Sequence, residues 1–139
     1  MDVYSHLHEM NTNKGAAQGT KTGFSGLDAV LAGMGDSDLV LVGARPGMGK
    51  TSFTLNIAAN VAKSSGKAVC IFSLEMTAEQ LAMRMLSSEG MVSNNAMRTG
   101  KLTEEEWDKL CYATDKLSSC DIRIDDTAGI TISQMRAKL

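Results

Sequence analysis

Residues 44–51 read Ala44-Arg45-Pro46-Gly47-Met48-Gly49-Lys50-Thr51 and match the phosphate-binding loop pattern at every position but the first. That pattern is a glycine-rich turn between a strand and a helix, and it closes on Gly-Lys-Thr. The run Leu-Val-Leu-Val at 39–42 is the continuous apolar stretch expected of a strand buried on both faces of a parallel sheet. Residues 52–63 carry apolar side chains at every fourth position and are predicted to form a helix. The sequence thus predicts a strand, a phosphate-binding loop and a helix in the required order.

The chemistry of this loop follows from its backbone. Gly47 and Gly49 let the chain turn so that successive N–H groups point at an anion, and the following helix adds the positive end of its dipole. Lys50 is expected to reach the outer phosphates of a nucleotide, and the Thr51 hydroxyl to complete the shell of a magnesium ion. Pro46 is the single proline of the chain and would stiffen the loop before a ligand arrives. The sequence therefore predicts nucleotide binding with Mg²⁺.

Ala44 is the one departure from the pattern, because the strict motif has a glycine at this position. The alternative interpretation is a strand–turn–helix unit whose glycines only make the turn. We disfavour it because Gly-Lys-Thr and both flanking elements are predicted together.

Composition and charge exclude several classes of protein. The 139 residues suffice for one domain with a core but do not suggest two, and the net charge of −2 gives no basic footprint for nucleic acid. The sequence has neither an apolar stretch approaching a membrane span nor the apolar core of a signal peptide, so we expect a cytoplasmic protein that does not enter a membrane. The three cysteines lack metal-ligand spacing and are expected to be reduced thiols.

The N-terminal residues differ in character from the rest of the chain. Residues 1–14 carry one thin apolar stripe at helical spacing, which is too small to form a core alone. Residues 11–21 contain two glycines and no hydrophobic side chain larger than alanine, as in a flexible linker. We therefore divide the chain into a linker helix with a flexible linker over 1–21 and a domain over 22–139.

A second strand is predicted at 69–72, after the loop helix, and Glu75 comes directly after it. A strand, a helix and a second strand in this order form a parallel crossover unit, whose ligand crevice lies at the carboxyl ends of the strands. Glu75 could there orient a water against the terminal phosphate. It could equally be a charge on a surface loop, and its position alone leaves both interpretations open.

Three later helices are predicted from capping boxes, in which a threonine is followed three residues later by glutamine or glutamate. The pairs are Thr77 with Gln80, Thr103 with Glu106, and Thr131 with Gln134. Apolar spacing predicts the residues that line the first two helices: Leu81, Met85 and Leu86, then Trp107, Leu110, Cys111, Thr114 and Leu117.

The Ile-Arg-Ile run at 122–124 alternates like a half-exposed strand before Asp125 and Asp126. An apolar strand ending in an aspartate that holds magnesium would be the second motif of a nucleotide site. Because Arg123 would not fit a buried central strand, we predict a peripheral strand and a turn here instead.

Several separated stretches resemble the ATPase domain of replicative DNA helicases of the DnaB type. They are Thr22-Gly23-Phe24 with Leu27-Asp28, the loop at 43–51, Ser73-Leu74-Glu75-Met76, and Arg98-Thr99-Gly100-Lys101-Leu102. The resemblance runs from about Thr22 to the end of the chain, and that family tolerates alanine at the position of Ala44.

The resemblance implies a RecA-like α/β fold of the P-loop NTPase type, with a mainly parallel sheet flanked by helices. It further implies a hexameric ring in which ATP hydrolysis with Mg²⁺ is coupled to movement along single-stranded DNA, with primase or other replication proteins as partners. In this family the residue matching Glu75 is the general base, and a helix matching residues 1–14 packs on the neighbouring subunit.

The chain departs from the family in its extent. Family members are longer, and beyond a helix such as that predicted after Thr131 they continue into the strand with the magnesium aspartate, the DNA-binding loops and an arginine finger. We therefore expect a fragment whose fold is incomplete at its C-terminal end. Two alternatives to a helicase stay open: a non-catalytic ATP-binding or subunit-contact module, and a related RecA-like ATPase of recombination or signalling.

Overall fold

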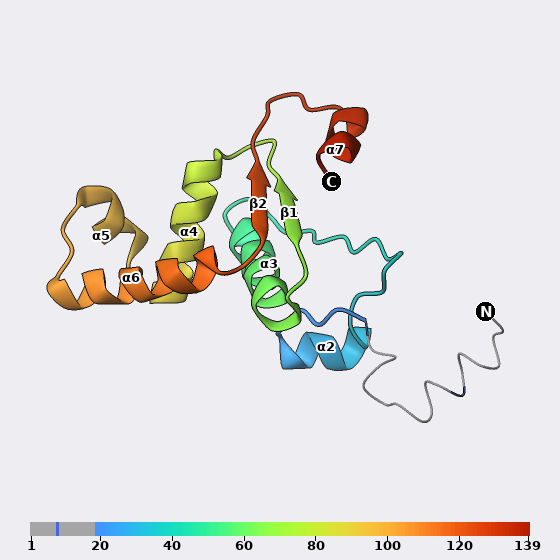
Figure 1. The fold of residues 1–139 in the computed structure, drawn as a ribbon, viewed down its shortest axis with the longest axis horizontal. Helices are drawn as coiled ribbons and strands as arrows, with labels where there is room; N and C mark the ends of the chain where they lie inside the picture. The colour runs from blue at the N-terminus through green and yellow to red at the C-terminus, as the bar shows by residue number, and fades with distance from the viewer. Residues whose placement is uncertain (1–7, 9–18) are drawn as a thin grey trace. The chain divides into compact units, whose positions relative to one another are not determined.

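The computed structural model describes residue 8 and residues 19–139, in two compact units, Met1–Gly43 and Ala44–Leu139. Apart from residue 8, the linker helix expected over 1–14 and most of the linker up to residue 21 lie outside the described residues. The elements follow the order α2 (Ser25–Leu31), α3 (Lys50–Ser65), β1 (Val69–Phe72), α4 (Ala78–Gly90), α5 (Asn94–Thr99), α6 (Glu104–Ser118), β2 (Ile122–Asp125) and α7 (Ile132–Lys138) (Figure 1). The division of domains at residue 22 stays a prediction.

The first unit is organised around the side chain of Asp28 in α2. Its Oδ1 accepts hydrogen bonds of 2.7 Å from both the backbone N–H and the hydroxyl of buried Thr22, and these bonds hold the pKa of the carboxyl below its usual value. An antiparallel bridge between Thr20 and Met34 closes the segment on either side of the helix. Helix α2 thus lies between the two bridged residues, with its start tied to Thr22.

The strand predicted at 39–42 does not form, and this expectation was wrong. These residues have no strand assignment, and Leu39 and Leu41 are each 85% exposed. Among the described residues the sheet contains two strands only, β1 and β2. An apolar run indicates only that its side chains tend to be buried. A strand also needs a neighbouring strand that forms hydrogen bonds with its backbone N–H and C=O groups. The mainly parallel sheet is therefore present only as one parallel pair.

In the second unit, β1 and β2 pair in parallel, with Val69 opposite Ile122 and Phe72 opposite Asp125. Both strands lie where the sequence predicts them, and Arg123 is exposed, as expected for a peripheral strand. The core cluster joins α3 and α4 through four buried side chains, with the isoleucines of both strands packed against it: Leu55, Ala59, Leu81 and Met85, then Ile71, Ile122 and Ile124. The helix after the phosphate-binding loop is therefore fixed to the sheet by its apolar face.

The three predicted capping boxes are all present. In each, the threonine side chain accepts from the backbone N–H three residues on, while the glutamine or glutamate side chain accepts from the threonine N–H. They start α4, α6 and α7, whereas the short helix α5 was not predicted. None of the described helices combines the length and apolar character required to cross a membrane.

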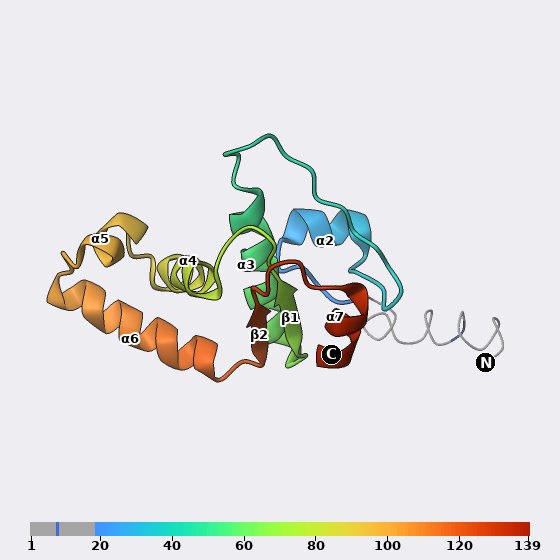
Figure 2. The ribbon, with the colours of Figure 1, turned by 90° about the horizontal axis from the view of Figure 1, so that it is seen from above.

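The lining predicted for α6 is correct only in part. Leu110 is buried and Leu117 partly buried, but Trp107 is 57% exposed and Cys111 and Thr114 are also exposed. Helix α6 packs on α4 (Figures 1 and 2). The last residue of α4, Gly90, lies against Lys109, Leu110 and Ala113. Trp107 projects from α6 beyond that point, so the apolar spacing is right but the partner helix is too short to cover it.

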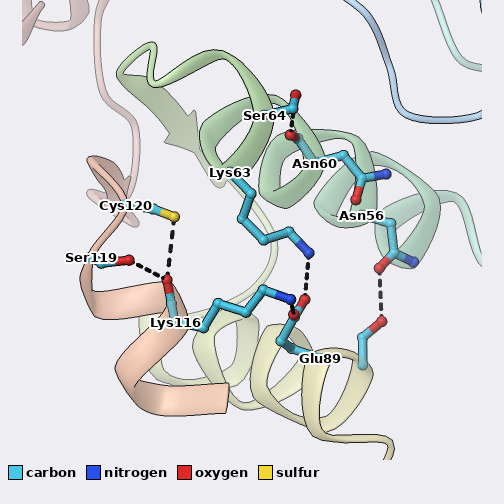
Figure 3. Close-up of polar contacts among 9 residues, drawn as sticks. Asn56, Asn60, Lys63, Ser64, Glu89, Lys116, Ser119 and Cys120 are labelled. Carbon is cyan, nitrogen blue, oxygen red and sulfur yellow. Dashed lines mark hydrogen bonds and ion pairs between the residues drawn. The ribbon is translucent and has the colours of Figure 1, made fainter. Parts of the chain in front are cut away.

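Glu89 of α4 joins three helices through its carboxylate. Lys63 of α3 binds Oε2 at 2.6 Å and Lys116 of α6 binds Oε1 at 2.5 Å (Figure 3). Burial alone would raise the pKa of the Glu89 carboxyl, but the hydrogen bonds from Lys116 and Lys63 outweigh it and hold the pKa below the ordinary value of 4.5. The ionised carboxylate therefore stabilises the packing of α3, α4 and α6.

Glu89→Gln is expected to lower the free energy of unfolding at pH 7 by about 1 to 2 kcal/mol. Hydrogen bonds to charged groups contribute roughly 1.5 to 3 kcal/mol, and the exposure of Lys116 reduces that through solvent screening. Because the folded-state pKa is lowered, the contribution is complete above about pH 4.5 and is lost as the pH falls through the lowered pKa. Urea unfolding of wild type and variant from pH 7 to pH 3 measures both effects.

Glu105→Gln is the matched control for this experiment. Glu105 pairs with Lys109 on the same helix, but its side chain is 79% exposed, so we expect no measurable change in the free energy of unfolding. Two results would contradict this role of Glu89. The two substitutions could change the free energy of unfolding equally, or the difference between wild type and Glu89→Gln could be the same at pH 3 as at pH 7.

Candidate nucleotide-binding site

The predicted phosphate-binding loop has the backbone that its glycines make possible. Gly47 and Gly49 have φ angles of 76° and 83°, in the left-handed region that favours glycine. Gly49 is the N-cap of α3 and Lys50 is its first residue. The free N–H groups and the positive dipole end of a sixteen-residue helix therefore face the loop.

A cavity of about 500 Å³ lies over this loop. It is lined by every predicted loop residue except Met48, together with Ser52, Glu75, Met76 and Arg84. Met48 is 73% exposed and does not line it. The structure thus brings Glu75 to the same cavity as Lys50 and Thr51.

Glu75 is carried on a turn whose two ends are fixed. The hydroxyl of Ser73, just after β1, donates to the Met76 carbonyl oxygen at 2.6 Å and accepts from the Met76 N–H at 3.0 Å. At the start of α4 the Ala78 N–H donates to Asp126 Oδ2 at 2.8 Å, beside the Thr77 capping box. These bonds leave the Glu75 side chain exposed at the edge of the cavity.

Asp125, the last residue of β2, and Asp126, which follows it, are held by protein groups and do not line this cavity. Asp125 binds the Lys138 ammonium group and the Thr127 N–H, and these hydrogen bonds lower the pKa of its carboxyl to about 2. Asp126 binds the first turn of α4. Each carboxylate thus has a structural role in joining β2 to a helix.

Arg84 is the residue of the cavity that sequence reasoning missed. It lies on α4 between Leu81 and Met85, which are both buried. The sequence contains a signal for it. Arg84 comes three residues after Leu81 and one before Met85, and a residue at that spacing lies close to the buried face of a helix. The cavity thereby receives three cationic side chains, Arg45, Lys50 and Arg84, against one carboxylate.

Comparisons with known proteins show which family the chain resembles. Residues 19–139 match the family model described as the DnaB-like helicase C terminal domain. The chain is 50% identical over 138 residues to the replicative DNA helicase DnaC of Bacillus subtilis (strain 168), and 48% identical over 138 residues to the replicative DNA helicase DnaB of Geobacillus stearothermophilus. Each alignment covers 99% of this chain and 30% of the relative, so the chain spans about a third of the length of these relatives.

Two solved structures have a similar fold. One is described as an ATPase domain, with a TM-score of 0.89 and 29% identity over 98% of this chain and 48% of that one. The other is a DnaB-like replicative helicase described with its interactions with primase, with a TM-score of 0.87 and 29% identity over 98% of this chain and 33% of that one. The α/β arrangement of the second unit, with its glycine-rich loop, helices and parallel strands, fits these matches. With its residues 19–139 matched by the family model, the chain belongs to the DnaB-like helicase C-terminal domain family.

Proposed function

We propose that this chain is the nucleotide-binding part of a replicative DNA helicase, in which ATP hydrolysis is coupled to unwinding and translocation on single-stranded DNA. The observation that carries the proposal is the cavity that places Glu75 beside the phosphate-binding loop, in a chain of the DnaB-like family. Family membership also favours a helicase over a RecA-like ATPase of recombination or signalling.

The loop residues would bind the phosphates of ATP. The N–H groups at the start of α3 donate to the phosphate oxygens, and the Lys50 ammonium group neutralises the outer phosphates. Thr51 lines the cavity and would hold Mg²⁺ through its hydroxyl. Magnesium commonly takes few protein ligands and completes its shell with phosphate oxygens and water, so a lone hydroxyl beside the phosphates fits its chemistry. When bound, the ion neutralises charge that develops on the phosphates.

Glu75 would act as the general base. Its carboxylate lines the same cavity as the loop and would accept the proton of the water that attacks the terminal phosphate. The fixed turn after β1 holds this carboxylate at the cavity edge before the nucleotide binds.

The complete protein would have a RecA-like ATPase domain that begins near residue 22, preceded by a linker helix over residues 1–14, and would assemble as a hexameric ring in the cytoplasm. The relatives support only the greater length in this proposal, because the chain covers 30% of each of them. Primase is the partner that we propose besides single-stranded DNA, because one similar structure is described with its interactions with primase.

ATP binding by the chain as it stands tests the proposal. Isothermal titration with Mg²⁺ and ATP is expected to give one binding site for the wild type, and Lys50→Ala is expected to abolish the measurable heat. Thermal unfolding with ATP at about a hundred times its Kd should show roughly 2.7 kcal/mol of ligand stabilisation, which the variant lacks. Lys101→Ala, which removes an exposed lysine outside the cavity, should bind like the wild type.

Two outcomes would change the conclusion. If the wild type binds no ATP, or Lys50→Ala binds it equally well, the cavity is not a nucleotide site. If ATP binds but no phosphate is released, the chain acts as a non-catalytic binding module. That reading has support in the cavity, where Glu75 is the single carboxylate.

A further inference from the structure

The Arg84 guanidinium group lacks an acceptor among the residues that the structure describes. No hydrogen bond or ion pair to it occurs within residues 19–139, although the side chain is half-buried between α3 and α4. A guanidinium group has five N–H donors and keeps its charge at every pH of interest. A partly desolvated group of this kind is expected to bind an anion from outside the chain.

The surroundings of Arg84 favour an anion strongly. The side chain lines the cavity over the phosphate-binding loop, and Lys50 and Arg45 line it too, although the chain as a whole is acidic. Arg84 also lines a neighbouring cavity of about 600 Å³ between α3 and α4. There the nearby carboxylate, that of Glu89, is already bound by Lys63 and Lys116, so it is not an available partner for Arg84.

The position of Arg84 indicates which part of a nucleotide it would meet. The residues that line the cavity come from two segments of the chain: the loop with the start of α3, and the segment from Glu75 into α4 that carries Arg84. A nucleotide whose phosphates follow the loop N–H groups and Lys50 would extend its terminal phosphate toward Glu75 and Arg84, the two charged residues of the second segment. Leu81 and Met85 are buried in the core and fix the backbone of α4 on either side of Arg84.

We infer that Arg84 binds the terminal phosphate of ATP and makes the site prefer ATP over ADP. This inference rests on the proposed function, because it assigns a further binding residue to the same site. A planar guanidinium group donates two parallel hydrogen bonds to a phosphate, and ADP has no phosphate at that position.

The test compares the affinities of the chain for ADP and for the non-hydrolysable β,γ-imido analogue of ATP, by titration with Mg²⁺. Arg84→Ala is expected to weaken binding of the analogue about tenfold or more, and binding of ADP by less than about twofold. Arg84→Lys keeps the charge but loses the planar fork, so its loss should be intermediate. Arg98→Ala, which removes an exposed arginine of α5 outside the cavity, is the matched control and should leave both affinities unchanged.

Unfolding of each variant without nucleotide separates a structural role from a binding role. If Arg84 has a purely structural role, Arg84→Ala should lower the free energy of unfolding and weaken the binding of both nucleotides by the same factor. That result would overturn the inference. An unchanged ratio of affinities in Arg84→Ala would overturn it as well and leave the proposed function intact. If the wild type binds neither nucleotide, the proposed function fails, and the role of Arg84 fails with it.

Discussion

Glu75→Gln is expected to lower the rate of ATP hydrolysis by about 10²- to 10⁴-fold, the usual contribution of a general base. The amide has nearly the shape of the carboxylate but cannot accept the proton of the attacking water. ATP binding should change by less than about twofold, because the residues proposed to bind the phosphates, those of the loop and Arg84, are left unchanged by this substitution. Phosphate release under saturating ATP and Mg²⁺, beside titration of ATP, measures the two quantities separately.

Glu79→Gln is the control for this substitution, since Glu79 is an exposed carboxylate in the first turn of α4 that does not line the cavity. It should hydrolyse ATP like the wild type. If Glu75→Gln turns ATP over at the wild-type rate, another group activates the water, and Glu75 is only a charge on a surface turn.

Leu81→Ala is expected to lower the free energy of unfolding by about 3 kcal/mol. Leu81 is 2% exposed and packs in the core cluster with Leu55, Ala59 and Met85. Large-to-small substitutions at such positions typically remove about 2 to 5 kcal/mol, through the lost burial and the cavity left behind. That is a large share of the stability of a small domain, so a substantial unfolded fraction should be detectable without denaturant.

Urea unfolding followed by far-ultraviolet circular dichroism measures this loss. Leu74→Ala removes the same atoms from a side chain that is 74% exposed, and should change the free energy of unfolding by less than about 0.5 kcal/mol. A loss below about 1 kcal/mol for Leu81→Ala would mean that α3 and α4 do not share a packed core in solution.

The features that the sequence predicted well are those that neighbouring residues determine. A capping box needs only two residues three apart, and all three boxes are present in the structure. The strand at Val69–Phe72 also lies where its apolar run predicts it. In the candidate site, the loop and Glu75 were predicted, and the structure brings them to one cavity.

The features that were missed depend on partners distant in the sequence. The run at 39–42 has the composition of a buried strand but no neighbouring strand among the described residues, so it stays exposed. Trp107 lies at helical spacing from Leu110, a core position of α6. It stays exposed because α4 ends at Gly90, which lies against Leu110 and Ala113. Arg84 was missed because apolar periodicity identifies the buried face of α4 and gives no information on which cavity borders that face.

The parallel pairing of β1 and β2 has a consequence for the order of folding. The helices α4, α5 and α6 lie between the two strands in the sequence, so the chain must close a long loop before the first strand-to-strand hydrogen bond forms. Helices α4 and α6 are separated in the sequence only by the short helix α5. The entropy lost when they pack together is therefore smaller than that lost when β1 pairs with β2. The helices therefore gain contacts early and the sheet late. Glu75 follows β1, and Asp126, which follows β2, binds the start of α4, so the segment that carries Glu75 gains its second fixed end only when the two strands have paired.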